Sequence, residues 1–363
     1  MTADEPPREL RRGWTTGACA TAATKAAFGA LAGLGFADPV AIRLPRGGTA
    51  SFVLAERGQG VGAAWAGVVK DAGDDPDVTH GCLVRATVRP GAPGSGVTFH
   101  AGPGVGTVTR LGLQLPPGEA AINPVPRQMM RQVVAEIAAA TGAATDVAVT
   151  ISIPGGEILA KQTLNGRLGI VGGLSILGTT GVVVPFSCAA WIHSIHRGID
   201  VARAAGLAHV AAATGSTSER AVQALYGLPE MALLDMGDFA GGTLKYLRRH
   251  PLPRLSVAGG FAKLAKLGQG RLDLHSSRSS LDQAALAAFA AAHGAAPPLV
   301  GQIVGANTGA QILGDAQAAG FPLADLVAAQ ARLVSCEAVG PEVAVEVLVI
   351  DRQGRVVGRA AGW

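Results

Sequence analysis

The chain of 363 residues is 48% hydrophobic, 4% aromatic and 15% charged, and its formal net charge is +4. This composition excludes a disordered chain, and the length predicts two domains. The 24 arginines and six lysines are scattered and are not interleaved with aromatic residues, which argues against a nucleic-acid-binding surface. Dispersed arginines suit a small ligand with several carboxylates, because a guanidinium group binds a carboxylate through two hydrogen bonds.

Neither the start of the chain nor its long uncharged run predicts an export or membrane segment. Residues 1–13 are polar and lack the apolar core of a signal peptide. Leu168–Phe186 is about as long as a membrane span, but it contains five glycines and a proline, so we expect buried strand and loop there. The four cysteines form no Cys-x-x-Cys pair, and neither a zinc ribbon nor a redox dithiol is indicated. We expect a cytoplasmic protein without a membrane partner; homo-oligomerisation is left open.

The first half of the sequence predicts an α+β domain over residues 1–187. A threonine pair, Thr15 and Thr16, precedes an alanine-rich stretch, which is typical of a capped helix. Asn123 can cap a second helix, whose first positions tolerate the prolines found there. In chain order we expect a helix over 17–33, strands over 40–54 and 82–89, a helix over 125–141 and a strand over 147–153.

The most unusual part of this domain is the acidic segment, Lys70–Gly81. Four aspartates occupy seven positions between Lys70 and His80. Gathering like charges raises electrostatic repulsion, which a fold tolerates where the charges serve a purpose. The spacing lacks the alternating ligands of an EF-hand, although a magnesium ion held by one or two aspartates is left open. The segment is either a solvated turn or a loop that faces a ligand or takes part in catalysis.

The second half predicts a doubly wound α/β domain over residues 188–335. Strands expected over 209–213, 231–236 and 255–258 are each followed by a turn and a helix, which indicates a parallel sheet. Ser216 and Glu219 have the spacing of a capping box for the first of these helices. A helical stretch follows over 281–335. A terminal hairpin within 336–363, with strands over 343–350 and 355–359, is expected to complete the first domain.

Parallel sheets bind ligands beyond the carboxyl ends of their strands. In this sequence those ends hold Thr214, Gly215, Ser216, Asp235, Gly237, Asp238, Gly259 and Gly260. The Thr214–Ser216 turn can present backbone N–H groups to an anion, but it has neither a P-loop lysine nor a complete Gly-x-Gly-x-x-Gly motif. Asp235 at the end of the second strand can accept ribose hydroxyls, which fits an adenosyl cofactor as well as a dinucleotide.

Two lysines and a histidine follow this edge. Lys263 and Lys266 lie one helical turn apart, so both can face one ligand. His275 lies in a hydroxyl-rich loop that could hold carboxylates, or could be a solvated surface turn.

Taken together, five segments resemble the cobalt-precorrin-5B C1-methyltransferases of the CbiD type. They are Arg11–Ala20, Lys70–Gly81, Ala121–Arg127, Leu168–Gly181 and Gly259–Lys266, in order along most of the chain. The resemblance implies S-adenosylmethionine as methyl donor and a cobalt-bound tetrapyrrole as acceptor, methylated at C1 to give cobalt-precorrin-6A in cobalamin biosynthesis. It also implies a two-domain α/β structure, with cobalt arriving as part of the substrate and no metal site of the protein. One departure is Ala18, where many relatives are expected to carry threonine or serine.

The resemblance and the residue patterns together give one set of expected site residues. The expected catalytic residues are Asp71, His80 and His275. The expected cofactor-binding residues are Thr214, Gly215, Ser216, Asp235, Gly237, Asp238 and Gly259. The expected substrate-binding residues are Thr15, Thr16, Lys70, Asn123, Arg127, Lys263 and Lys266. We expect the aspartates of the acidic segment to orient Lys70, His80 and nearby arginines, or to face the sulfonium, rather than to contact the carboxylates of the acceptor.

Three other functions are compatible with parts of the sequence. A nicotinamide-dependent oxidoreductase could use the same doubly wound domain, although the missing dinucleotide motif counts against it. A non-catalytic tetrapyrrole carrier would bind the acceptor without the methyl donor. A metal-dependent phosphatase acting through the acidic segment is the most distant alternative.

Overall fold

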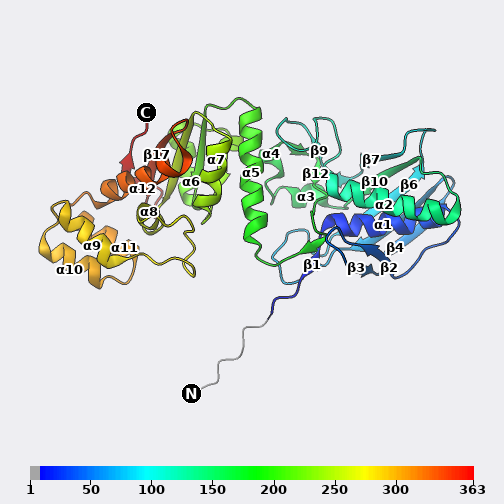
Figure 1. Cartoon of the computed structure of the whole chain (residues 1–363), viewed down its shortest axis with the longest axis horizontal. Coiled ribbons are helices and arrows are strands. Elements are labelled where there is room, and N and C mark those ends of the chain that lie inside the picture. The colour runs from blue at the N-terminus through cyan, green and yellow to red at the C-terminus, as the bar shows by residue number, and fades with distance from the viewer. Residues whose placement is uncertain (1–8) are drawn as a thin grey trace, which may run out of the picture. The chain divides into compact units, whose positions relative to one another are not determined.

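The computed structural model describes residues 9–363. Residues 1–8, on which the expectation about a signal peptide mostly rests, lie outside the described residues. The first compact unit ends at Cys188 and the second runs from Ala189 to Trp363 (Figure 1). Among the described residues, no helix combines the length and the apolar character needed to cross a membrane.

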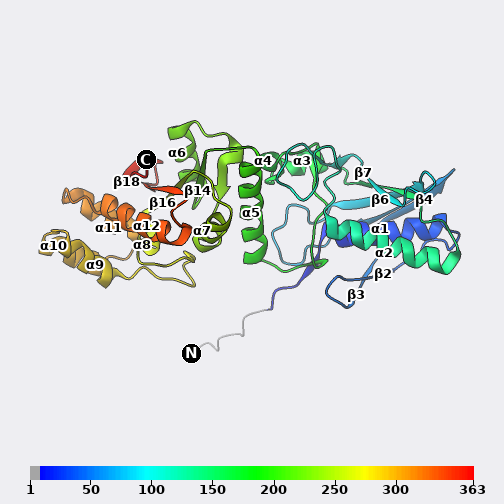
Figure 2. The same cartoon turned by 45° about the horizontal axis from the view of Figure 1, so that its top comes forward.

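A five-stranded sheet and two helices form the body of the first unit. The sheet order is β4-β5-β6-β10-β7, with strands Glu56–Gly60, Ala63–Val69, Leu83–Pro90, Val147–Ser152 and Val97–Ala101. Helices α1 (Thr16–Leu31) and α2 (Pro124–Thr141) lie side by side along it (Figures 1 and 2). The alternating burial of β6 and β10 and the small residues of α1 explain the close packing.

Helices α1 and α2 begin at the same end of the first unit. Gly17 near the start of α1 lies against Pro126 of α2, and Gly29 near the end of α1 lies against Ile137. The Thr15 side chain caps α1 by accepting from the Ala18 N–H, as the sequence predicted. Asn123 occupies the N-cap position of α2, but its side chain makes no capping hydrogen bond; its backbone carbonyl accepts from the Arg127 N–H at 3.1 Å.

The strand pattern of the first unit departs from the sequence prediction at several strands. The strand expected over 40–54 is a hairpin of β2 (Val40–Arg43) and β3 (Thr49–Phe52). Strands β4, β5 and β7 of the five-stranded sheet were not predicted, and the glycines and alanines of β4 and β5 have low strand propensity.

Short elements make up the rest of the first unit. The run Leu168–Phe186 forms short strands and loops, as expected, but it is only partly buried, since Val171, Leu177, Val184 and Phe186 are exposed. The remaining elements are β1 (Gly13–Trp14), β8 (Gly104–Val105), β9 (Thr107–Val108), α3 (Gly156–Ala160), α4 (Asn165–Leu168), β11 (Ile170–Val171), β12 (Gly173–Leu174) and β13 (Val182–Val183).

The second unit contains the predicted parallel sheet. Its order is β15-β14-β16-β17-β18, with strands Leu233–Asp235, His209–Ala213, Arg254–Gly260, Ala344–Ile350 and Val356–Ala360. The first four strands are parallel and β18 is antiparallel to β17. The chain leaves β14 for β15 on one side and returns to β16 on the other. This reversal is the topological switch point at which such sheets bind ligands.

Helices cover both faces of this sheet, which confirms the predicted α/β class. Val222 of α6 packs with Ala211, Ala258 and Leu348 on one face. The opposite face packs against the other helices in the larger core. The helices are α5 (Cys188–Ala204), α6 (Ser216–Tyr226), α7 (Ala240–Arg249), α8 (Phe261–Gly268), α9 (Gln283–Ala292), α10 (Pro297–Gly305), α11 (Gly309–Ala318) and α12 (Leu323–Val339).

Two predictions about the second unit are wrong. The terminal hairpin does not complete the first domain, because β17 pairs in parallel with β16 over its whole length. Strand pairing between distant segments has no local sequence signature. The capping box is also wrong, since α6 begins at Ser216 and its N-cap is Gly215, which has no side chain to accept a bond. A short 3-10 turn, Glu230–Ala232, replaces the first residues of the strand expected over 231–236.

Candidate functional site

The turns that follow β14, β15 and β16 meet at the carboxyl edge of the second sheet. The Gly237 N–H donates to the Ala213 carbonyl at 3.1 Å, which joins the turn after β15 to the end of β14. The Thr214 N–H donates to the Ala258 carbonyl at 2.9 Å, which joins the turn after β14 to β16. The structure therefore brings together the predicted cofactor-binding residues, which lie on three separate turns.

Lys263 of α8 ties these turns to each other. Its Nζ donates to the Thr214 carbonyl at 3.0 Å and lies 3.0 Å from Asp238 Oδ1. Asp238 Oδ1 is buried and accepts no well-aligned hydrogen bond from the described residues, so its contact with Lys263 is an ion pair with poor hydrogen-bond geometry. A charge held in this way can change partner when a ligand arrives.

The backbone requires glycine at two positions of this edge. A Cβ on Gly259 would lie 2.8 Å from both Oγ1 and Cγ2 of Thr214, so the close approach of the two turns requires glycine. Gly237 has φ +56°, in the left-handed region that favours glycine. Helix α6 begins after Gly215 and directs its first backbone N–H groups to the same edge. The edge can therefore receive a polar ligand close to the backbone.

The two predicted lysines do not face one ligand. Lys266 is buried, and its Nζ donates to the Leu274 carbonyl at 2.8 Å, so it holds the segment that follows α8. The Leu274 N–H donates to the Asp238 carbonyl at 2.9 Å, which brings that segment to the edge. His275 follows at once; its ring is exposed, with Nδ1 2.7 Å from Ser277 Oγ.

In the acidic segment of the first unit, three aspartates bind backbone or side-chain groups of distant residues. Arg11 forms a two-pronged ion pair with Asp71, with Nη2 2.9 Å from Oδ1, and its backbone N–H donates to Asp74 Oδ2 at 2.7 Å. Asp75 Oδ1 accepts from the Phe186 N–H at 2.8 Å. The hydrogen bond from Arg11 lowers the pKa of Asp71 to about 2. These contacts fasten the segments around residues 11 and 186 to the loop.

The fourth aspartate neutralises a buried lysine. Lys70 is 1% exposed, and its Nζ lies 2.7 Å from Asp77 Oδ2. Asp77 Oδ1 accepts from the N–H and the hydroxyl of Thr79 at 2.7 and 2.6 Å. Burial acts to raise the pKa of Asp77, but the hydrogen bonds from Lys70 and Thr79 outweigh it, and the pKa is lowered. The expectation that the aspartates orient Lys70 and an arginine agrees with these contacts.

His80 has one ring nitrogen engaged. Its Nδ1 accepts from the Ala72 N–H at 3.1 Å, so the neutral ring carries its proton on Nε2. The same Nδ1 lies 3.9 Å from Asp71 Oδ1, and this contact would be an ion pair only if Nδ1 were protonated. Because the bond from the Ala72 N–H is shorter, Nδ1 acts as its acceptor. Among residues 9–363, no three His, Cys, Asp or Glu side chains gather as metal ligands.

The other predicted substrate-binding residues of the first unit meet around Ile176 and Leu177. Thr16 Oγ1 accepts from the Leu177 N–H at 3.0 Å, and the Asn123 N–H donates to the Ile176 carbonyl at 2.9 Å. Arg127 donates to the Ile122 carbonyl at 2.7 Å and to Glu119 at 2.8 Å. Thr15 and Thr16 are buried. The structure brings these residues together, but their polar groups bind other parts of the protein.

Sequence reasoning missed two residues of these sites. Trp191 lies at the carboxyl edge of the second sheet, where its indole N–H donates to the Asp235 carbonyl at 2.9 Å. Arg11 closes the acidic segment from 60 positions away. A tryptophan near the start of a helix carried no local signal of this role, and the Arg11 contact depends on long-range folding.

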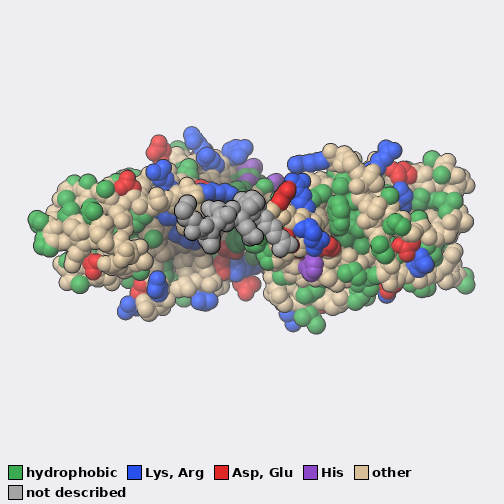
Figure 3. Space-filling model, turned by 90° about the horizontal axis from the view of Figure 1, so that it is seen from below, with side chains coloured by type: hydrophobic (Ala, Val, Ile, Leu, Met, Phe, Trp, Pro, Cys, Tyr) green, Lys and Arg blue, Asp and Glu red, His purple; other side chains and the backbone are tan. Residues whose placement is uncertain are grey.

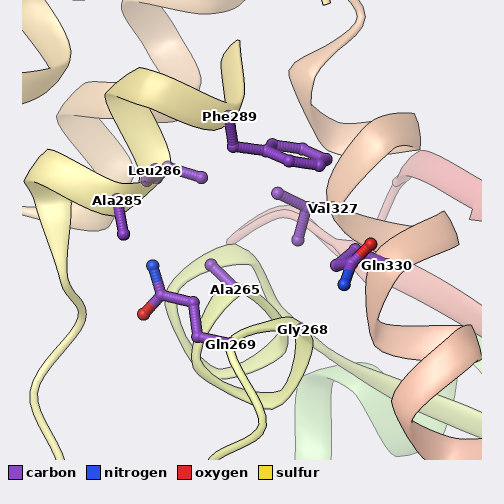
Figure 4. Close-up of a pocket in the computed structure, with 8 residues that line it drawn as sticks. All are labelled: Ala265, Gly268, Gln269, Ala285, Leu286, Phe289, Val327 and Gln330. Carbon is purple, nitrogen blue, oxygen red and sulfur yellow. The ribbon is translucent and has the colours of Figure 1, made fainter. Parts of the chain in front are cut away.

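One pocket of about 230 Å³ lies between α8, α9 and α12 (Figure 4). Its lining residues are Ala265, Gly268, Gln269, Ala285, Leu286, Phe289, Val327 and Gln330. These side chains are uncharged and include none of the predicted site residues, so the pocket is a poor match for a ligand with several carboxylates. On the face shown in Figure 3, Lys and Arg side chains are spread over both units and interspersed with acidic ones.

Comparison with known proteins gives consistent matches along the chain. The family described as CbiD matches residues 3–185, and CbiD, C-terminal domain, matches residues 273–361. A cobalt-precorrin-5B C(1)-methyltransferase of Brucella anthropi is 62% identical over 352 residues, which cover 97% of this chain and 96% of that protein. One from a Bradyrhizobium species is 61% identical over 99% of this chain and 96% of its own length. A crystal structure of the cobalamin biosynthesis protein CbiD from Archaeoglobus fulgidus is 28% identical, covers 74% of this chain and 83% of its own, and has a TM-score of 0.40.

Proposed function

The chain belongs to the CbiD family, and from that premise we propose that it transfers a methyl group from S-adenosylmethionine to C1 of cobalt-precorrin-5B, giving cobalt-precorrin-6A in anaerobic cobalamin biosynthesis. The observation that carries this proposal is the identity of 62% to a protein named for that reaction, over nearly the full length of both chains. The match includes both units of the structure.

The donor is proposed to bind at the carboxyl edge of the second sheet. This edge is the switch point between β14 and β16, where doubly wound sheets bind nucleotide-like ligands. Asp235 would accept the ribose hydroxyls, and the Thr214–Ser216 turn would approach the ligand through its backbone. Gly237, Asp238 and Gly259 complete the proposed donor site.

Within the first unit, the acceptor is proposed to contact the acidic segment and the start of α2. The rings of His80 and His275 are exposed and can reach a ligand. Other residues have polar groups bonded within the protein, and we propose that they shape the site rather than hold carboxylates; they are Thr15, Thr16, Lys70, Arg127 and Lys266.

The chemistry places modest demands on the protein. A ring carbon of the reduced macrocycle supplies the electron pair for the new C–C bond, and the S–CH₃ bond of the sulfonium breaks to leave a neutral thioether. The main contribution of the protein would be to hold the two carbons and the sulfur in line and to exclude water. No strong base is needed to activate such a nucleophile, so weakly basic side chains such as His80 and His275 would be sufficient.

The proposal is tested by incubating the protein with methyl-labelled S-adenosylmethionine and cobalt-precorrin-5B. We expect label at C1 of the product. Recovery of bound but unlabelled cobalt-precorrin-5B would contradict the proposal and favour the tetrapyrrole carrier, while oxidation of an added reduced nicotinamide cofactor would favour the oxidoreductase.

The donor site has its own test. Asp235→Ala is expected to weaken S-adenosylmethionine binding in calorimetry, because the ribose hydroxyls lose their acceptor. Asp315→Ala on α11 is the matched control, since it removes the same carboxylate from another element. Equal affinities of wild type and Asp235→Ala would rule out the proposed role of Asp235.

A further inference from the structure

Trp191 is a large aromatic side chain that is exposed yet fixed in position. It lies near the start of α5 and is 46% exposed. Its Nε1 donates to the Asp235 carbonyl at 2.9 Å, which orients the indole at the end of β15. An exposed indole held by a hydrogen bond is ready to receive a flat partner, because little side-chain freedom is lost when the partner binds.

The indole lies against the turn that follows β15. A Cβ on Gly237 would be 3.4 to 3.6 Å from Cζ2, Cε2 and Nε1 of the ring, which is van der Waals contact. The Phe239 ring is 6.2 Å away and tilted by 50°. The backbone of one turn and one neighbouring ring therefore set the position of the indole.

This position is continuous with the proposed donor site. The Gly237 N–H is bonded to the Ala213 carbonyl, and Asp238 in the same turn pairs with Lys263, which also binds the Thr214 carbonyl. Hydrogen bonds and one ion pair thus link Trp191 to each turn of the carboxyl edge. Its hydrogen bond places it beside the residue proposed to hold the ribose.

We propose that Trp191 stacks on the adenine of the methyl donor, an inference that rests on the proposed function. A ribose held by Asp235 carries its base to the surface near that residue, and the indole offers the flat apolar partner there. Stacking between a base and an aromatic side chain contributes substantially to affinity and does not depend on which base is bound. Trp191 would then select nucleoside-bearing sulfonium compounds over simple ones.

The test measures binding of adenosine and of S-adenosylhomocysteine by calorimetry and by tryptophan fluorescence. We expect Trp191→Ala to weaken both ligands by the same factor, about fivefold to 100-fold. Trp191→Phe keeps an aromatic ring and is expected to stay within about threefold of wild type. The same Trp191→Phe variant should lose the fluorescence change caused by the ligand, a readout that a purely structural role would not move.

Trp363→Ala is the matched control. Trp363 is another partly exposed tryptophan of the second unit, and its ring contacts His209 and Tyr226 instead of the carboxyl edge. Its removal should leave both affinities within about twofold, as expected for a site with no shared partners. Thermal unfolding of each variant confirms that it is folded.

The outcomes separate the two proposals. If wild type binds adenosine but Trp191→Ala binds it equally well, or if the fluorescence change persists in Trp191→Phe, the role of Trp191 is wrong while the proposed function stands. If wild type binds neither adenosine nor S-adenosylhomocysteine, the adenosyl donor itself is wrong and the inference falls with it.

Discussion

The acidic segment of the first unit and the carboxyl edge of the second sheet both gather residues that suggest chemistry, but they use them differently. In the acidic segment, each of the four aspartates binds a described partner within the protein. At the carboxyl edge, Gly259 lets the turn after β14 approach β16 closely, and Asp238 Oδ1 is held only by an ion pair with poor hydrogen-bond geometry. The dense charge of the acidic segment is thus taken up by contacts within the protein, while the carboxyl edge retains a carboxylate that can change its partner.

The largest expected effect is in the acidic segment. Asp77→Ala removes the partner of a lysine that is 1% exposed, and an uncompensated buried charge lowers the free energy of unfolding by about 3–5 kcal/mol. Chemical denaturation of the first unit's transition measures this loss. The double variant Lys70→Met/Asp77→Ala should recover most of it, since it also removes the buried charge. A loss below about 1 kcal/mol in Asp77→Ala would mean that the Lys70–Asp77 pair contributes little to the stability of the first unit.

The next effect compares the two lysines of α8. Lys266→Met should lower the free energy of unfolding by about 2 kcal/mol, because the Leu274 carbonyl loses a charged donor. Its affinity for S-adenosylmethionine should stay within about threefold of wild type. Lys263→Met should leave the free energy of unfolding nearly unchanged but weaken the binding of S-adenosylmethionine. If both substitutions weakened binding equally without loss of stability, the two lysines would face one ligand after all.

A pair of adjacent glycines tests the openness of the edge. Gly259→Ala pushes against Thr214 and should weaken donor binding by about tenfold, equivalent to about 1.4 kcal/mol. Gly260→Ala is the matched control, since a Cβ there would meet no described atom within 4 Å. Calorimetry on both variants gives the comparison. Equal affinities would show that the approach of Thr214 to Gly259 is irrelevant to the donor.

The smallest effect is in the pH dependence of stability. The pKa of Asp71 is lowered to about 2 in the folded protein, so the folded state binds fewer protons than the unfolded state between about pH 2 and 4. The stabilisation is present above about pH 4 and is lost as the pH falls toward 2. Asp71 is 44% exposed, so the effect is less than about 1 kcal/mol. Urea unfolding of wild type and Asp71→Asn should converge toward pH 2; a constant difference across this range would contradict it.

The sequence was informative where local patterns determine structure. The strand–turn–helix units of the second half and the Thr15 cap follow from periodicity and capping, and β14 was predicted with its bounds. It was less informative where distant segments meet. The pairing of β17 with β16, the contact of Arg11 with Asp71 and the burial of Lys266 all depend on the assembled core. The sequence cannot distinguish a buried lysine such as Lys266 from a more exposed one such as Lys263, because burial depends on packing between distant segments.

The central claim is that the second sheet binds the methyl donor, while the aspartates of the acidic segment stabilise the first unit and do not bind the donor. Hydrogen–deuterium exchange of the full chain with and without S-adenosylmethionine tests it most directly. The account predicts slower exchange in residues 214–219, 235–239 and 259–263, with unchanged exchange in residues 70–81. Protection confined to residues 70–81 would contradict it.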